Sequence, residues 1–237
     1  MSNKYTFKYG LNKKLILSNP DGVFTPTGTT KALVEGVIKY IDSPGKILDL
    51  GCGNGVTGIV MHQSGLVTPP LYISDLSEKA VQTASENALF YECPVVAKSG
   101  SIFDPWVGEK FDYILNDISG IAREIAKKSN WFDSVPCNTG EDGSELVGQM
   151  LNEAPLYLKE NGKLFFPIIS LSNVEKILSV ARSNFNNIER ISRNEWPLPK
   201  ELSDHKEMLK NLESNSSISV TTKFGIMLYF TDIYVAY

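Results

Sequence analysis

One short segment limits the possible folds of this chain more than any other, because an apolar run leads directly into a cluster of glycines and then into a helical pattern. Residues 46–50 (Lys-Ile-Leu-Asp-Leu) have the apolar character of a buried strand, and Gly51, Gly53 and Gly55 follow at alternate positions. The spacing predicts a helix from about Val56 to Gly65. A strand, a glycine turn and a helix in this order begin a βαβ unit, the building block of parallel sheets.

The same alternation of apolar runs and helical patterns continues along most of the chain. Further strands are predicted at residues 71–74, 94–97, 111–115 and 162–169. Asp75 and Glu78 have the spacing of a capping box, which would open the next helix. The β-rich stretches 187–196 and 224–237 flank a helical pattern at 200–212 and would add an antiparallel edge pair. We therefore expect an α/β fold with a Rossmann-like, doubly wound and mostly parallel seven-stranded sheet and an antiparallel last strand.

Charge and cysteine content argue against several other classes of protein. Lys and Arg number 23 against 27 Asp and Glu, so the net charge of −4 provides no overall field to attract a nucleic-acid backbone. The three cysteines form no CxxC pair, and neither His62 nor His205 has a companion at metal-ligand spacing, so neither a disulfide framework nor a metal site is expected. The N-terminus lacks the apolar stretch of a signal peptide, and no apolar run is long enough to span a bilayer. We expect a cytoplasmic protein without a membrane partner.

The glycine loop has the composition of a ligand-binding turn. Alternating glycines let the backbone approach a ligand closely, and the following helix offers free N–H groups to a carboxylate. Asp49 adds a carboxylate that suits an ammonium group, so the loop fits an amino-acid-like ligand better than a pyrophosphate.

Residues 53–58 also form a G-x-G-x-x-G pattern, with Asp75 at a distance that suits a ribose hydroxyl. A nicotinamide-dependent oxidoreductase is therefore an alternative. A catalytically silent module that binds a cofactor or a partner is another, and Asp75 has the alternative role of a helix N-cap.

Five segments share one family pattern. They are D-L-G-C-G-N-G at 49–55, G-V-F-T-P-T-G-T-T at 22–30, G-S-I-F-D-P followed by F-D-Y-I-L within 100–115, T-G-E-D-G at 139–143 and L-K-E-N-G-K-L at 158–164. In combination they resemble the methyltransferase small-domain family of class I S-adenosylmethionine-dependent methyltransferases, relatives of the release-factor glutamine methyltransferases. The resemblance covers roughly residues 22 to 170. It implies an enzyme that binds S-adenosylmethionine and transfers its methyl group.

The length of 237 residues fits one domain of this kind. We expect a single methyltransferase domain over residues 1–237. It would comprise an N-terminal segment (1–44), a cofactor-binding core (45–170) and C-terminal strands that complete the sheet (171–237).

By the resemblance, residues at the strand ends would surround the cofactor. Asp49 and the three glycines would enclose its methionine part, and Asp75 would bind its ribose. Ser101, where the family usually has Asp, and Ile102 would lie along its adenine. The full set of predicted cofactor-binding residues is Asp49, Gly51, Gly53, Gly55, Asp75, Ser101, Ile102 and Asn116.

The residues expected at the reacting centre depart from the family pattern. Relatives that methylate amide or base nitrogens carry N-P-P-Y where this chain has D-I-S-G at 117–120. Asp117 keeps a hydrogen-bond acceptor, so we predict that it accepts hydrogen bonds from the substrate nucleophile, with Ser119 assisting. The alternative is that both residues cap a helix expected at 121–128.

Aromatic residues are the candidates for substrate contact, namely Phe24, Trp131 and Phe132. An irregular insertion at 129–140 is predicted to close over Asp117 as a lid. Net acidity and Gly120 in place of an aromatic residue favour a small molecule or a peptide as substrate, with RNA as the second candidate. Nitrogen is the expected methyl acceptor, because the relatives with a hydrogen-bond acceptor at this position methylate nitrogen.

Overall fold

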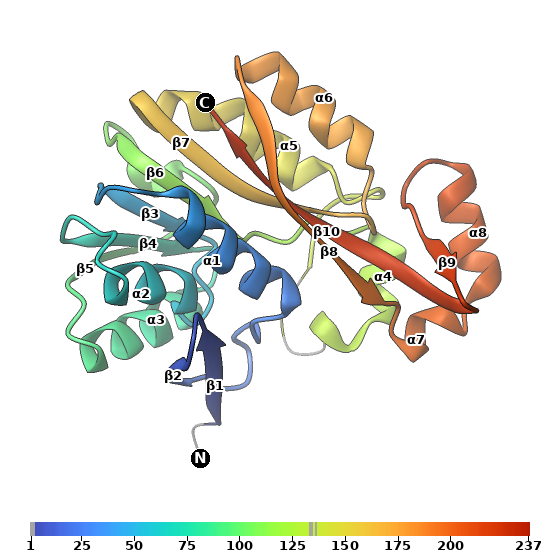
Figure 1. Cartoon of the computed structure of the whole chain (residues 1–237), viewed down its shortest axis with the longest axis horizontal. Helices are drawn as coiled ribbons and strands as arrows, with labels where there is room; N and C mark the ends of the chain where they lie inside the picture. Colours follow the sequence, from blue (N-terminus) through green and yellow to red (C-terminus); the bar gives the residue numbers. More distant parts are fainter. Residues whose placement is uncertain (1–2, 133–134, 136) are drawn as a thin grey trace.

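A central sheet organises the computed structural model, which describes residues 3–132, 135 and 137–237. Its strands lie in the order β5-β4-β3-β6-β7-β10-β8, and the short strand β9 pairs with β10 (Figure 1). The bounds are β3 Ile47–Leu50, β4 Leu71–Asp75, β5 Val95–Ser99, β6 Phe111–Asn116, β7 Leu158–Ile169, β8 Ile188–Pro197, β9 Thr221–Lys223 and β10 Ile226–Ala236. The five neighbouring strands β5, β4, β3, β6 and β7 run parallel to one another. Strand β10 runs antiparallel to β7, β8 and β9. The predicted mostly parallel sheet with an antiparallel last strand is confirmed, and β9 adds an eighth strand to the seven expected.

Helices cover both faces of this sheet, as a doubly wound fold requires. Their bounds are α1 Gly28–Tyr40, α2 Val56–Gln63, α3 Glu78–Phe90, α4 Arg123–Lys128, α5 Glu145–Glu153, α6 Val174–Asn184, α7 Lys200–Ser203 and α8 Lys206–Ser214. Short 3₁₀ turns η1, η2 and η3 occur at Asp104–Trp106, Asn130–Phe132 and Ala154–Tyr157. No helix in the described ranges combines the length and the apolar character needed to cross a membrane.

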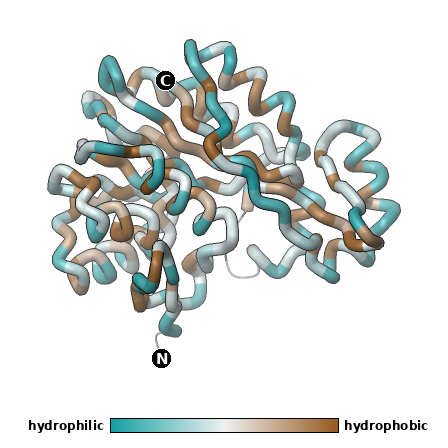
Figure 2. Tube along the Cα trace, viewed as in Figure 1, coloured by the Kyte–Doolittle hydropathy of each residue, from teal (hydrophilic) through white to brown (hydrophobic). Residues whose placement is uncertain are grey.

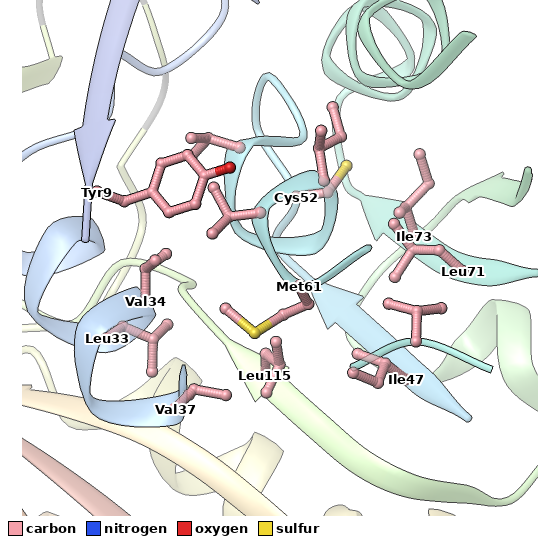
Figure 3. Close-up of a cluster of buried hydrophobic side chains, with 14 of the residues drawn as sticks. Tyr9, Leu33, Val34, Val37, Ile47, Cys52, Met61, Leu71, Ile73 and Leu115 are labelled. Carbon is pink, nitrogen blue, oxygen red and sulfur yellow. The ribbon is translucent and has the colours of Figure 1, made fainter. Parts of the chain in front are cut away.

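Successive residues of the central strands enter different hydrophobic clusters. Ile47 of β3 and Leu115 of β6 pack under α1, α2 and α3, where Met61 of α2 joins them (Figure 3). Their chain neighbours Leu48 and Ile114 belong instead to the cluster under α5 and α6. Both faces of these strands are therefore buried, which explains why they read as unbroken apolar runs in the sequence. By contrast, β8 lies at the sheet edge and is mostly hydrophilic (Figure 2).

An N-terminal hairpin precedes the sheet and was not predicted. Its strands β1 (Lys4–Tyr9) and β2 (Lys13–Ser18) form a separate antiparallel pair. Alternate residues of both strands are buried in the cluster under α1, α2 and α3. The free edge of β2 is bound by side chains of the α3 region. The Asn87 side-chain amide accepts a hydrogen bond from the Ser18 N–H (2.8 Å) and donates one to the Ser18 carbonyl (3.0 Å). The Tyr91 hydroxyl likewise accepts from the Ile16 N–H (2.6 Å) and donates to the Ile16 carbonyl (3.2 Å).

Three predicted helix details are wrong. The N-cap of α3 is Ser77, whose Oγ accepts a hydrogen bond from the Ala80 N–H (3.3 Å), so Asp75 and Glu78 form no capping box. Asp75 accepts instead from the Ser77 N–H (2.9 Å), which places it before the cap. The late helical pattern at 200–212 is divided into α7 and α8, and the helix expected at 121–128 begins only at Arg123.

A third cluster joins the segment after β6 to the segment between β8 and β10. We call it the C-terminal cluster; its buried members are Ile121, Ala122, Ile125, Ala126, Leu171, Leu198, Leu202, Leu209 and Ile218. Figure 1 shows α7, α8 and β9 gathered at one end of β10, with α4 beside them. The partly buried residues that pack against this cluster include Trp131, Phe132 and Tyr229.

Candidate functional site

A cavity of about 610 Å³ lies where β3, β4 and β6 end at their carboxyl edges. In open α/β sheets this edge is where ligands bind. The lining comes from the glycine loop, the turns after β4, β5 and β6, and the segment before α1. The predicted site residues in this lining are Phe24, Gly51, Gly53, Asp75, Ser101, Ile102, Asp117 and Ser119.

The glycine loop forms one wall with a backbone that other residues would not adopt easily. Gly51 and Gly53 have φ of +78° and +53°. A Cβ on Gly51 would lie 2.7 Å from Cγ2 of Ile118, so a side chain there would collide with the turn after β6. A Cβ on Gly53 would meet only the Phe24 carbonyl at 3.9 Å, so its backbone is open to the cavity. Gly55, at φ +83°, is the N-cap of α2 and is not part of the cavity lining.

Asp49 lies beneath this loop and not in the cavity wall. It is fully buried, and its Oδ2 accepts a hydrogen bond from the Gly58 N–H (2.8 Å). Among the described residues its Oδ1 has no hydrogen-bond partner. The pKa of Asp49 is raised to about 7. Burial is the main cause and the Asp75 carboxylate adds to it, while the hydrogen bond from the Gly58 N–H acts in the opposite direction.

Asp75 connects the end of β4 to the glycine loop. Its Oδ2 accepts a hydrogen bond from the Gly53 N–H (3.0 Å), while its Oδ1 accepts from Ser77. The side chain is half-buried at the cavity wall. The helix N-cap alternative for Asp75 is wrong, because Ser77 caps α3.

Ser101 and Ile102 line the cavity beyond Asp75. Ile102 is buried and has φ of +43°, in the left-handed region that β-branched residues rarely adopt. Backbone strain of this kind persists only where the surrounding structure holds it, and it clusters at ligand sites.

Asp117 stands at the end of β6, between two cavities. The residue as a whole is half-buried, and the pKa of its carboxyl is raised to about 7. Burial of the carboxyl is the main cause and the Asp49 carboxylate adds to it, while a hydrogen bond with Thr30 acts in the opposite direction. The alternative role as a helix cap is wrong, because α4 has Ala122 at its N-cap and no side-chain cap. Asn116 is fully buried and outside both linings; its Oδ1 accepts from the Ile118 N–H (3.4 Å), and its Nδ2 has no partner among the described residues.

A smaller pocket of about 50 Å³ adjoins the main cavity and shares Phe24, Asp117, Ile118 and Ser119 with it. Its lining includes four aromatic residues. The rings of Phe24 and Phe132 lie 5.3 Å apart, and those of Trp131 and Tyr229 lie 5.8 Å apart. The structure thus brings the three predicted substrate residues together beside Asp117, and it adds Tyr229 of β10, which the sequence analysis missed.

The predicted lid is described only in part. Residues 133, 134 and 136 of the insertion lie outside the described residues. Cys137, Asn138 and Thr139 line the main cavity. Closure of this segment stays a prediction.

Three buried asparagines link the glycine loop to the N-terminal segment, and the sequence analysis missed them too. Asn54 donates to Asn19 Oδ1 (2.8 Å), and Asn87 of α3 donates to the Asn54 carbonyl (2.9 Å). Asn19 in turn donates to Thr25 Oγ1 (3.0 Å), in the segment that carries Phe24. We call this chain of hydrogen bonds the asparagine relay.

Comparison with known proteins identifies the family. The family model described as "Methyltransferase small domain" matches residues 14–117, which include the glycine loop, Asp75 and Asp117. Over residues 14–117, less than half of its length, the chain matches the methyltransferase small domain family. The resemblance inferred from the motifs, to class I S-adenosylmethionine-dependent methyltransferases, is therefore confirmed.

Curated relatives in this family include release factor glutamine methyltransferases. That of Thermodesulfovibrio yellowstonii is 33% identical over 184 residues, which cover 71% of this chain and 63% of the relative. That of Streptococcus pneumoniae is 26% identical over 168 residues, covering 68% of this chain and 57% of the relative. The chain thus spans less than two thirds of the length of these two relatives.

Solved structures share the fold of this family at low sequence identity. The Thermus thermophilus 16S rRNA N2 G1207 methyltransferase, solved in complex with AdoMet and guanosine, has a TM-score of 0.64 at 11% identity and covers 99% of this chain and 50% of its own. The ribosomal protein L11 methylase of Lactobacillus delbrueckii has a TM-score of 0.52 at 17% identity, over 88% of this chain and 81% of its own. Both likenesses confirm the Rossmann-like fold.

Proposed function

We propose that the protein is an S-adenosylmethionine-dependent methyltransferase that methylates a nitrogen of a small molecule or a peptide. The observation that carries this proposal is a single cavity in which the glycine loop, Asp75 and Asp117 meet at the ends of adjacent strands. The match to this family supports the same activity. One cavity of this kind can hold a cofactor on one side and an acceptor on the other.

The residues present fit the cofactor. The backbone at Gly53 is open to the cavity, where a side chain would take up ligand space, and the buried Asp49 Oδ1 lacks a partner within the described part of the chain. Asp75, Ser101 and Ile102 continue the lining beyond the loop, where the nucleoside part of the cofactor would lie. When bound, S-adenosylmethionine would supply a methyl group activated by its attachment to a sulfonium.

The charge of the cavity lining favours a cationic ligand over an anionic one. Its charged members among the described residues are Asp75 and Asp117, with no Lys or Arg beside them. This favours the sulfonium and ammonium charges of S-adenosylmethionine over the pyrophosphate of a nicotinamide nucleotide.

Asp117 and Ser119 would position the acceptor. Methyl transfer requires alignment of a nucleophile with the methyl carbon, and orientation of this kind contributes roughly 7–11 kcal/mol in well-oriented reactions. The release factor glutamine methyltransferases described above favour nitrogen in a protein or peptide, and the net charge of −4 favours such a substrate over RNA.

Two measurements test the proposal. Calorimetry with S-adenosylhomocysteine and with oxidised and reduced nicotinamide nucleotides should give saturable binding of the first alone; binding of the nucleotides alone would overturn the proposal. A methyl-transfer assay with labelled cofactor against metabolite, peptide and RNA pools should then label a metabolite or a peptide. Label in RNA alone would replace the proposed acceptor class by the second candidate.

A further inference from the structure

The small pocket beside Asp117 has a chemistry that narrows the acceptor further, on the basis of the function proposed above. Asp117 is the one charged residue among the described residues that line it. Among those residues it forms no ion pair, and the nearest carboxylate that influences it, Asp49, has the same sign of charge. An ionised carboxylate so placed attracts a positive group.

Four aromatic rings form part of the remaining surface. Phe24 and Phe132 contribute one tilted pair, and Trp131 and Tyr229 contribute another. The faces of aromatic rings carry negative electrostatic potential and attract ammonium groups. The rings and the carboxylate therefore favour the same kind of guest.

The size of the pocket limits that guest. Its volume of about 50 Å³ is small beside the roughly 610 Å³ of the main cavity that it adjoins, so we expect it to hold one end of an acceptor. An ionised Asp117 offers no donor to the carbonyl oxygen of a primary amide end. That donor would have to come from a hydroxyl of the lining, on Thr27, Thr29 or Ser119. An ammonium end has donors only, which match a carboxylate and ring faces.

We propose that this pocket binds the ammonium end of an aliphatic amine, which Asp117 holds and deprotonates before methyl transfer. One N–H bond breaks as an O–H bond forms on the Asp117 carboxylate, and the electron pair stays on the nitrogen. The neutral amine that results is the nucleophile. The rings of this pocket thus take the place of the family's aromatic residue, where this chain has Gly120. The pocket selects an amine, whereas the relatives named above are glutamine methyltransferases.

Ligand-observed NMR on the whole chain, saturated with S-adenosylhomocysteine, tests this selection with three matched probes: n-pentylamine, n-pentanol and pentanamide. The amine should bind about 10-fold more tightly than either neutral probe, because hydrogen bonds to charged groups are stronger than neutral ones. Asp117→Asn should remove this preference when the variant is likewise saturated with S-adenosylhomocysteine, at a concentration set by calorimetry on the variant itself. Equal or tighter binding of pentanamide to the wild type would overturn the inference, and so would an unchanged preference in Asp117→Asn.

Ring variants test the aromatic walls. Trp131→Leu and Tyr229→Leu should each weaken binding of pentylamine by about 2- to 30-fold, the range of cation–π contacts. Phe90→Leu, at an exposed position on α3, is the matched control and should leave it unchanged. If both ring variants bind pentylamine as the wild type does, the rings do not select the amine and the inference fails.

The same samples separate this inference from the function on which it depends. Loss of S-adenosylhomocysteine binding in the wild type would overturn both. Retained S-adenosylhomocysteine binding without a preference for the amine would overturn the inference alone.

Discussion

At the scale of single residues, two carboxyl groups dominate the chemistry of the site. Asp49 and Asp117 stand near the ends of neighbouring strands. Burial raises the pKa of both carboxyl groups, and the Asp49 carboxylate raises the pKa of Asp117 further. They differ in access, because Asp117 lines both cavities whereas Asp49 lies beneath the loop. We therefore expect substitution of Asp117 to change turnover and substitution of Asp49 to change the pH dependence of stability.

Replacing Asp117 by Ala should lower turnover by about 100-fold, the cost of losing one positioning contact, while cofactor affinity changes little. Steady-state kinetics on the acceptor found in the labelling assay, together with calorimetry of S-adenosylhomocysteine, would measure the two effects. Asp42→Ala is the control, because Asp42 is exposed at the opposite edge of the sheet. Unchanged turnover in Asp117→Ala would exclude a role at the reacting centre.

The pH dependence of stability should report Asp49. Its pKa is about 7 in the folded chain against 3.8 as the ordinary value, so between these two pH values the folded state keeps a proton that the unfolded state releases. The free energy of unfolding therefore falls as pH rises from about 4 to 7, by up to about 4 kcal/mol from this group, and then levels off.

Asp49→Asn should flatten this part of the profile, measured by urea unfolding at several pH values without ligand. Asp75, Cys52 and Asp117 also interact with Asp49 and remain in the variant, so the difference between the profiles reports Asp49 together with its effect on the pKa of Asp117. Identical profiles for wild type and variant would contradict a protonated Asp49.

At the scale of elements, the asparagine relay couples the N-terminal segment to the glycine loop. Asn54→Ala should destabilise the chain by about 1–3 kcal/mol, because it leaves the buried Asn19 amide oxygen without its donor. It should also weaken S-adenosylhomocysteine binding, because the segment that carries Phe24 is no longer held against the loop. Thermal unfolding and calorimetry measure both effects.

Asn152→Ala is the matched control for the relay, since Asn152 is exposed on α5 and pairs only with another surface amide. It should change neither quantity by a comparable amount. A loss of stability in Asn54→Ala without any loss of affinity would show that the relay supports the fold and does not shape the site.

Elements encoded by local pattern could be predicted from the sequence. The buried strand at Ile47–Leu50, the glycine loop and α2 follow one another within a short stretch, and each has its own composition signal. The hairpin of β1 and β2 also carries a signal, alternate apolar residues from Tyr5 to Leu17, but its lysines obscured it. Tyr229 and the asparagine relay could not be predicted, because their roles come from contacts between segments far apart in the chain.

At the scale of the whole molecule, segments from both ends of the chain share one core. Tyr9 of the hairpin, Ile47 of β3 and Val235 of β10 belong to the same hydrophobic cluster. We therefore expect residues 1–237 to unfold as the single domain predicted from the sequence. Thermal unfolding followed by circular dichroism and by tryptophan fluorescence should give coincident transitions. Two separated transitions would divide the chain into independent units.

The hydrogen bonds along the edge of β2 bear on how copies of the chain meet one another. An unpaired strand edge is a template on which a strand from another molecule can add, and the outcome is often aggregation. Here Asn87 and Tyr91 already occupy the backbone groups of Ser18 and Ile16 that an incoming strand would need. A foreign strand could pair with the β2 edge at these positions only after the hairpin had separated from Asn87 and Tyr91, so these two side chains protect that edge of the hairpin.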